Sequence, residues 1–134
     1  MSLSVRQLSV QFAVKGQVVR ALDHVDLEVQ PGRMLGVVGE SGSGKSTMAL
    51  AVLRLIEPPG QIVDGEILFE GNNLLSASEI EMRAIRGRKI GLVLQNPATA
   101  LNPTMTVGDH LMEAIQELLR LGRRESRRKA PAGR

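Results

Sequence analysis

One stretch of the chain combines residue types and spacing that suit a chemical task. Residues 37–47 read VVGESGSGKST, in which three glycines alternate with small polar residues ahead of a lysine and two hydroxyls. Glycines allow positive φ angles, so successive amide N–H groups can point into one concavity that holds phosphate oxygens. Residues Gly39 to Ser46 match the pattern G-x-x-x-x-G-K-[ST] in full. The stretch therefore predicts a phosphate-binding loop.

Each residue type in this loop has a distinct role. Lys45 would reach the β- and γ-phosphates of a nucleotide, Ser46 would place its hydroxyl on Mg²⁺, and Thr47 would meet the α-phosphate. A helix beginning at Lys45 would direct its positive dipole end at the same anion. A flexible glycine-rich linker is the alternative, which the apolar segments on both sides of the loop disfavour. The predicted phosphate-binding residues are Gly39, Glu40, Ser41, Gly42, Ser43, Gly44, Lys45, Ser46 and Thr47.

The elements that must position the loop follow from hydrophobic periodicity. Alternating apolar residues predict paired antiparallel strands near 4–12 and 23–30, joined by a turn at Lys15-Gly16. The segments MLGVV at 34–38 and KIGLVLQ at 89–95 are apolar on both faces, which predicts two buried parallel strands. The pattern thus mixes antiparallel pieces with a parallel α/β core.

Three helices and one further strand complete the predicted architecture. The first helix runs from Lys45 until EPPG at 57–60, where proline cannot continue it. GEILFEG at 65–71 reads as a strand. Ser78 precedes a second helix with Glu79 and Glu81 in its first turn, and Thr106 caps a third helix that ends at about Leu121.

The composition excludes several classes of function. The 134 residues suggest one domain, and the absence of cysteine excludes a disulfide framework or a thiolate metal site. Phe12 and Phe69 are the only aromatic residues, too few for a single-strand nucleic-acid platform. No apolar run approaches the ~18 residues of a membrane span. Since the N-terminus does not resemble a signal peptide, we expect a cytosolic protein, or one docked to a membrane through another protein.

The positive net charge of +3 comes entirely from the end of the chain. Residues 1–119 hold 10 basic and 13 acidic residues, a net of −3, whereas residues 120–134 hold 7 basic residues and 1 acidic residue, a net of +6. A nucleic-acid-binding face would have its basic residues spread over the folded domain, not gathered in the last segment of the chain. We therefore expect no specific nucleic-acid partner, only weak and salt-dependent binding of polyanions by the tail.

Four features together resemble the ATP-binding subunit of ABC transporters. They are the spelling GESGSGKST, the strand pair ahead of it, GEILFEGNNL after the first helix, and IGLVLQNP at 90–97, which is similar to the family's Q-loop. The longer segment at 86–114, with Leu101-Asn102-Pro103, resembles the importer branch for oligopeptides, dipeptides and nickel. The resemblance implies a P-loop NTPase core of the ABC ATPase type with an N-terminal antiparallel β subdomain.

The resemblance also implies roles for residues outside the loop. Gln95 would contact Mg²⁺ or the attacking water as a catalytic and metal-binding residue, although it could also be a polar strand end. Phe12 would stack on adenine, or could equally be a core residue. The implied cofactors are ATP and Mg²⁺. The 96–103 loop would meet membrane-spanning permease subunits, and a second ATPase subunit would complete a head-to-tail dimer at the inner face of the plasma membrane.

Several parts of the family's hydrolytic site have no counterpart in this sequence. No run of four apolar residues ends in Asp and Glu, and neither the L-S-G-G-Q signature nor a downstream switch histidine is present. We interpret residues 1–121 as a partial, C-terminally truncated ABC-type nucleotide-binding domain and 122–134 as a basic, frameshifted or truncated end; a deliberately shortened chain is the alternative. The functional alternatives are a non-catalytic nucleotide-binding fragment and, less favoured, another P-loop enzyme such as a small kinase.

Overall fold

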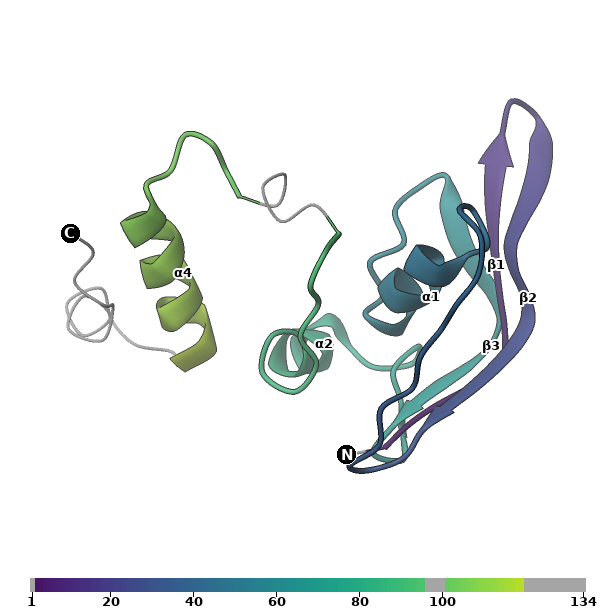
Figure 1. The fold of residues 1–134 in the computed structure, drawn as a ribbon, viewed down its shortest axis with the longest axis horizontal. Helices are drawn as coiled ribbons and strands as arrows, with labels where there is room; N and C mark the ends of the chain where they lie inside the picture. Colours follow the sequence, from purple (N-terminus) through teal and green to yellow (C-terminus); the bar gives the residue numbers. More distant parts are fainter. Residues whose placement is uncertain (1, 96–100, 120–134) are drawn as a thin grey trace. The chain divides into compact units, whose positions relative to one another are not determined.

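The computed structural model describes residues 2–95 and 101–119, which fall into two compact units, one ending at Arg86 and one beginning at Gly87. The first unit contains β1 (Leu3–Val14), β2 (Gln17–Val29), α1 (Lys45–Val52), β3 (Gly60–Phe69), β4 (Asn72–Asn73) and α2 (Glu79–Ile85) (Figure 1). The described part of the second unit contains α4 (Val107–Leu119). The predicted boundary at 122 lies outside the described residues.

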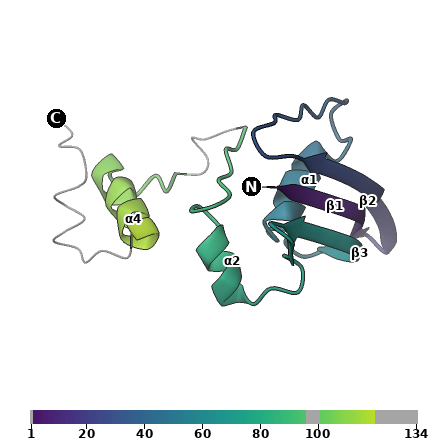
Figure 2. The ribbon, with the colours of Figure 1, turned by 90° about the horizontal axis from the view of Figure 1, so that it is seen from below.

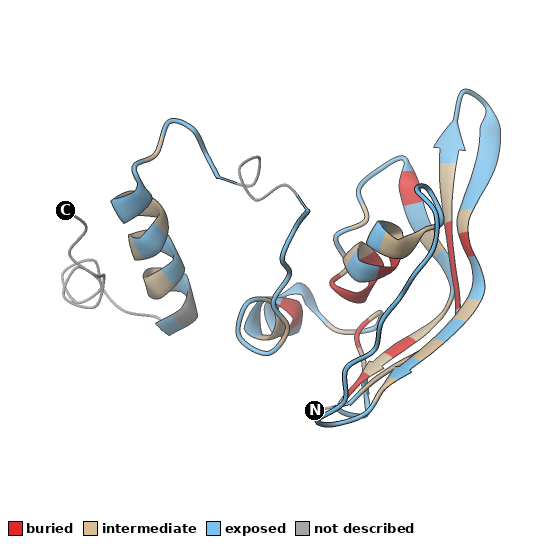
Figure 3. Cartoon of the chain, in the orientation of Figure 1, coloured by how far each residue is buried: buried red, intermediate tan, exposed pale blue. Residues whose placement is uncertain are grey.

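The first unit is built on an antiparallel sheet with the strand order β2-β1-β3-β4. The predicted pairing of the first two strands is confirmed, and their turn has positive φ at both Lys15 (48°) and Gly16 (79°), as two-residue hairpin turns require. Helix α1 covers one face of this sheet, as Figures 1 and 2 show. The buried residues of this unit include Leu8, Val10 and Ile67, each fully buried. Figure 3 colours the buried stretches of the sheet and of α1 red.

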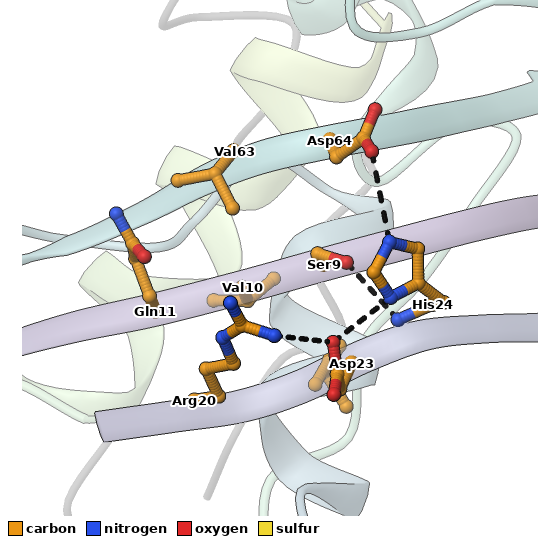
Figure 4. Close-up of a pocket in the computed structure, with 9 residues that line it drawn as sticks. Ser9, Val10, Gln11, Arg20, Asp23, His24, Val63 and Asp64 are labelled. Carbon is orange, nitrogen blue, oxygen red and sulfur yellow. Dashed lines mark hydrogen bonds and ion pairs between the residues drawn. The ribbon is translucent and has the colours of Figure 1, made fainter. Parts of the chain in front are cut away.

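Left-handed residues interrupt all three long strands at neighbouring positions. They are Gln7, His24 and Gly65, with φ of 47°, 48° and 95°, and the strand registers shift around them. The Ser9 hydroxyl accepts a hydrogen bond from the His24 amide at 3.0 Å, and the Asp64 carboxylate accepts one from the Gly65 amide at 2.8 Å. Figure 4 shows Ser9, His24 and Asp64 around the resulting shallow hollow. These bulges bend the sheet locally while satisfying the displaced amides.

Two predicted strands are wrong. Residues 33–40 and 91–94 form no strand, and Met34, Val38 and Val93 are 97%, 93% and 92% exposed instead of buried. A strand exists only where a neighbour completes its hydrogen-bond ladder, and apolar residues on both faces require covering layers on both sides. Within residues 2–95 and 101–119, no strand pairs with either segment.

The predicted helices all exist, with one boundary corrected. Helix α1 ends at Val52, before the predicted stop at EPPG, because Arg54 adopts a left-handed φ of 52°. The start of α2 is confirmed as a capping box between Ser78 and Glu81. Helix α4 begins after Thr106 as predicted, and its predicted last residues, 120 and 121, lie outside the described part. Within the described part of the chain, no helix is long and apolar enough to cross a membrane.

Two arginines tie the end of α1 to the segment around α2. The Arg86 guanidinium donates to the carbonyls of Leu53 and Arg54 at 2.8 and 3.4 Å and pairs with Glu79 at 2.6 Å. Arg54 in turn donates to the carbonyl of Ala77 at 2.5 Å. Cations at a helix C-terminus satisfy its last carbonyls and oppose the negative end of the helix dipole. This pair of arginines therefore anchors the end of α1 that lies away from the phosphate loop.

The capping box predicts a measurable change at Glu81. Hydrogen bonds from the Ser78 side chain and then from its backbone lower the pKa of Glu81 below 4.5. The carboxylate therefore adds stability above the ordinary pKa, and this contribution disappears as pH falls through the lowered value. Ser78→Ala should raise the pKa of Glu81 in a carbon-detected NMR titration. Ala77→Ser, a hydroxyl one residue earlier, should leave it low, and an unchanged pKa in Ser78→Ala would contradict the assignment.

Removing the Arg86 side chain should weaken the fold measurably. Arg86→Ala leaves two helix-end carbonyls without their charged donor, so we expect the free energy of unfolding to fall by ~2 kcal/mol in urea titrations. Arg83→Ala, which removes an exposed arginine from helix α2 directly before Arg86, is the matched control. Equal losses in the two variants would show that Arg86 contributes only as a surface charge.

Candidate phosphate-binding site

Residues 39–47 form the tight loop that the sequence predicts. Gly42 and Gly44 have φ of 83° and 88°, in the left-handed region that glycine enters at little cost. The amide of Ser43 turns back to donate to the carbonyl of Glu40 at 3.3 Å. Helix α1 follows directly, with Gly44 as its N-cap. Left-handed glycines directly before a helix N-terminus are an arrangement that can bind phosphate oxygens.

Gly44 also seats the loop on the sheet. A Cβ atom at this position would lie 2.5 Å from the Ala21 carbonyl oxygen and 2.8 Å from a Leu22 methyl carbon, so only glycine permits the contact. Strand β2 therefore sets the position of the α1 N-terminus. Sequence reasoning missed Ala21 because its contribution comes from the backbone; the glycine of the motif was the one signal that could have indicated a close neighbour.

Lys45 lies folded over its own loop. Its ammonium group donates to the carbonyls of Gly39 and Glu40 at 2.7 and 2.5 Å and to the Ser43 hydroxyl at 3.1 Å. These three acceptors use all three protons of the ammonium. The side chain is thereby held at the mouth of the loop, where a bound phosphate could replace the neutral acceptors with a charged one.

The start of α1 has the charge distribution that an anion needs. Gly44 supplies no capping side chain, and no acidic residue lies in the first turn. The first amide groups of a helix have no partner within the helix, and the macrodipole makes this end positive. Ser46 is exposed and Thr47 half-buried at the same end. The arrangement can bind phosphate oxygens through amides and one ammonium.

The residues beside the loop offer few oxygen ligands for Mg²⁺. Among the residues that the structure describes, no group of three His, Cys, Asp or Glu side chains could hold a metal ion. The exposed Ser46 hydroxyl is one suitable hard oxygen ligand beside the loop. These residues fit an ion that is held mainly by the phosphates it accompanies, because Mg²⁺ commonly binds with few protein ligands together with substrate phosphates.

A large hollow lies beside the loop. It has a volume of about 630 Å³ and is lined by Leu22 and residues 25–28 of β2, by residues 35–39 and by Ser43, Gly44, Lys45 and Met48. Leu35 and Val37 are 46% and 53% exposed at its wall. Residues 35–38 have no strand neighbours in the described chain, so their apolar side chains line the hollow. Because a mostly apolar wall does not suit phosphate oxygens, we do not assign the hollow to the phosphates.

The other predicted site residues lie outside the loop. Phe12 is half-buried on β1, opposite Val19 of β2 and Gly60 of β3. Gln95 is exposed and belongs to the second unit, so its contact with the metal or water stays a prediction. In the 96–103 loop, residues 96–100 lie outside the described part. Asn102 accepts hydrogen bonds from the Thr104 amide and hydroxyl at 3.0 and 2.7 Å.

Comparison with known proteins gives consistent matches over nearly the whole chain. The chain is 46% identical over 129 residues to the probable peptide ABC transporter ATP-binding protein y4tR of Sinorhizobium fredii. It is 41% identical over 129 residues to the oligopeptide transport ATP-binding protein OppD of Bacillus subtilis. Each match covers 96% of this chain but only 38% and 36% of the relative, so the chain spans little more than a third of their length.

Solved structures and a family model agree with these relatives. The dimeric structure of a post-hydrolysis state of the ATP-binding cassette MJ0796, bound to ADP and Pi, matches with a TM-score of 0.78 and 25% identity. That match covers 96% of this chain and 53% of the MJ0796 chain, which confirms the predicted ABC ATPase fold, present in part. The sequence model of the family described as "ABC transporter" matches residues 22–132. The chain therefore belongs to the ABC transporter family.

Proposed function

We propose that residues 39–47 bind MgATP through its phosphates. The observation that carries this proposal is the loop geometry: two left-handed glycines place the positive end of α1 and the Lys45 ammonium at one concavity. Membership of the ABC transporter family supports ATP as the nucleotide, and MJ0796 was solved with ADP and Pi. Gln95 and Ser46 would hold the metal ion beside the γ-phosphate.

The chain would serve as the ATP-binding part of an importer ATPase that powers uptake of peptides or a similar solute. Support comes from y4tR, OppD and the dipeptide transport protein DppD, whose names describe peptide transport. The 96–103 loop would contact permease subunits, which would hold the protein at the inner face of the plasma membrane. A second ATPase subunit would complete a head-to-tail dimer, in keeping with the dimeric MJ0796 structures.

The alternative is a non-catalytic nucleotide-binding fragment. It shares the ancestry and the phosphate loop, and differs only in whether ATP is turned over. The sequence feature that favours it is the lack of an apolar run followed by Asp and Glu. Binding and hydrolysis must therefore be tested separately.

Lys45 should provide most of the nucleotide affinity. Lys45→Ala removes the one full positive charge at the loop, so MgATP binding in calorimetry should weaken by more than about tenfold, or ~1.4 kcal/mol. Arg33→Ala, which removes an exposed positive charge shortly before the loop, is the matched control and should bind normally. An unchanged dissociation constant in Lys45→Ala would remove the assignment of the site.

This chain alone should release no phosphate above background from MgATP. Hydrolysis of a P-loop nucleotide needs an acidic residue to hold Mg²⁺ and a group to orient the water, and neither is positioned by the loop itself. Phosphate release from wild type should equal that of Lys45→Ala, which controls for contaminating ATPases. Turnover of about one per minute or more that Lys45→Ala abolishes would require a catalytic carboxylate from elsewhere in the chain.

A further inference from the structure

The space beside Gly60 that a side chain would need is already filled by neighbouring residues. A Cβ atom there would lie 2.5 Å from Cε1 of Phe12, 2.7 Å from Cγ2 of Ile56 and 3.0 Å from the carbonyl oxygen of Glu57. Unlike Gly42 or Gly44, Gly60 does not adopt a positive φ, so its backbone conformation does not require glycine. The requirement is therefore steric, and the ring of Phe12 makes the closest contact.

The ladder between β1 and β3 explains this contact. Phe12 and Gly60 are direct partners across the two antiparallel strands. Side chains of such partners lie on the same face, so a glycine leaves a gap over which the opposite aromatic ring can lie. Gly60 itself is buried, whereas Phe12 is only half-buried. The ring thus rests on Gly60 and keeps part of its surface accessible.

The accessible ring lies on the face of the sheet that carries the phosphate loop. Val10 and Phe12 are two residues apart on β1 and therefore share a face. Val10 pairs with Leu22, the residue against which Gly44 packs. The ring and the seat of the phosphate loop therefore lie on the same face of the sheet, two residues apart along β1.

The chemistry around the ring suits a flat, uncharged heterocycle. Val19, the partner of Phe12 on β2, is 51% exposed and extends the apolar surface beside the ring. Phe69, the other aromatic residue of the chain, is only 6% exposed and cannot offer a stacking face. A base that stacks on Phe12 would therefore depend on the orientation of a single ring.

We propose that Gly60 determines base recognition at the nucleotide site, because it fixes the Phe12 ring in the plane on which a purine base stacks. Gly60 acts through Phe12 and is a positioning residue; this inference rests on the proposed function. A side chain at residue 60 would displace the ring and weaken binding of the base, while the phosphate loop would remain intact.

The test compares a ligand that has a base with one that lacks it. Calorimetry of MgATP and of magnesium tripolyphosphate would be carried out on wild type, Gly60→Ala, Phe12→Leu and the double variant. Gly60→Ala should weaken MgATP binding by about tenfold, the scale expected for one base-aromatic stacking contact, and tripolyphosphate by less than about twofold. Gly91→Ala, at an ordinary φ with nothing near its Cβ, is the matched control and should match wild type.

The double variant decides whether Gly60 acts through the ring. If it does, Gly60→Ala should add no further loss in the Phe12→Leu background. Should Gly60→Ala alone fail to fold, the smaller leucine should restore folding in the double variant, and the loss of MgATP affinity in Phe12→Leu would show that the ring binds the base. A double variant that also fails to fold would place the clash at Ile56 or Glu57 and overturn the proposal.

Other results separate this inference from the proposed function. If wild type binds neither ligand, the phosphate site itself is wrong, and the inference fails with it. If Gly60→Ala weakens both ligands equally, or neither of them, the phosphate site stands and Gly60 has no role in base recognition.

Discussion

The contact between Gly44 and the backbone of β2 fixes the position of the phosphate loop. Because a side chain at Gly44 would collide with the Ala21 carbonyl, the N-terminus of α1 sits directly on the sheet. Helix α1 has eight residues, too few to be stable alone, so its position depends on such contacts. Arg86 holds the opposite end through the carbonyls of Leu53 and Arg54. The helix is thus held at both ends, and these contacts fix the direction of its axis and of its dipole.

With the helix fixed, the loop between sheet and helix is a candidate anion site. The folded Lys45 keeps a charge at its mouth, bound to the carbonyls of Gly39 and Glu40 in place of a phosphate. A bound phosphate would have to replace these neutral acceptors of the Lys45 ammonium. The same sheet face carries Phe12 supported by Gly60, which places a candidate base platform on the element that seats the loop.

Local signals predicted what local interactions determine. The turn at Lys15-Gly16, the start of α2 at Ser78 and the glycine-rich turn at 39–44 depend on neighbours in sequence, and their conformations were predictable; phosphate binding by that turn stays a prediction. The segments at 34–38 and 89–95 were predicted as buried strands, but strand formation depends on partners distant in sequence. The contact made by the backbone carbonyl of Ala21 leaves almost no signal in a single sequence. The same is true of a contact that depends on the lack of a side chain, as at Gly60.

If the start of α1 and its loop bind phosphate oxygens, the bonds are made through their amides, and these amides report binding. The most direct measurement is an amide NMR titration with MgADP. We expect the largest shifts, downfield as amides bond to anionic oxygens, at residues 42–47, with smaller ones at Phe12 and Val19. Largest shifts instead at Leu27 and Leu35, which line the apolar hollow, would place the ligand there and contradict phosphate binding by the loop.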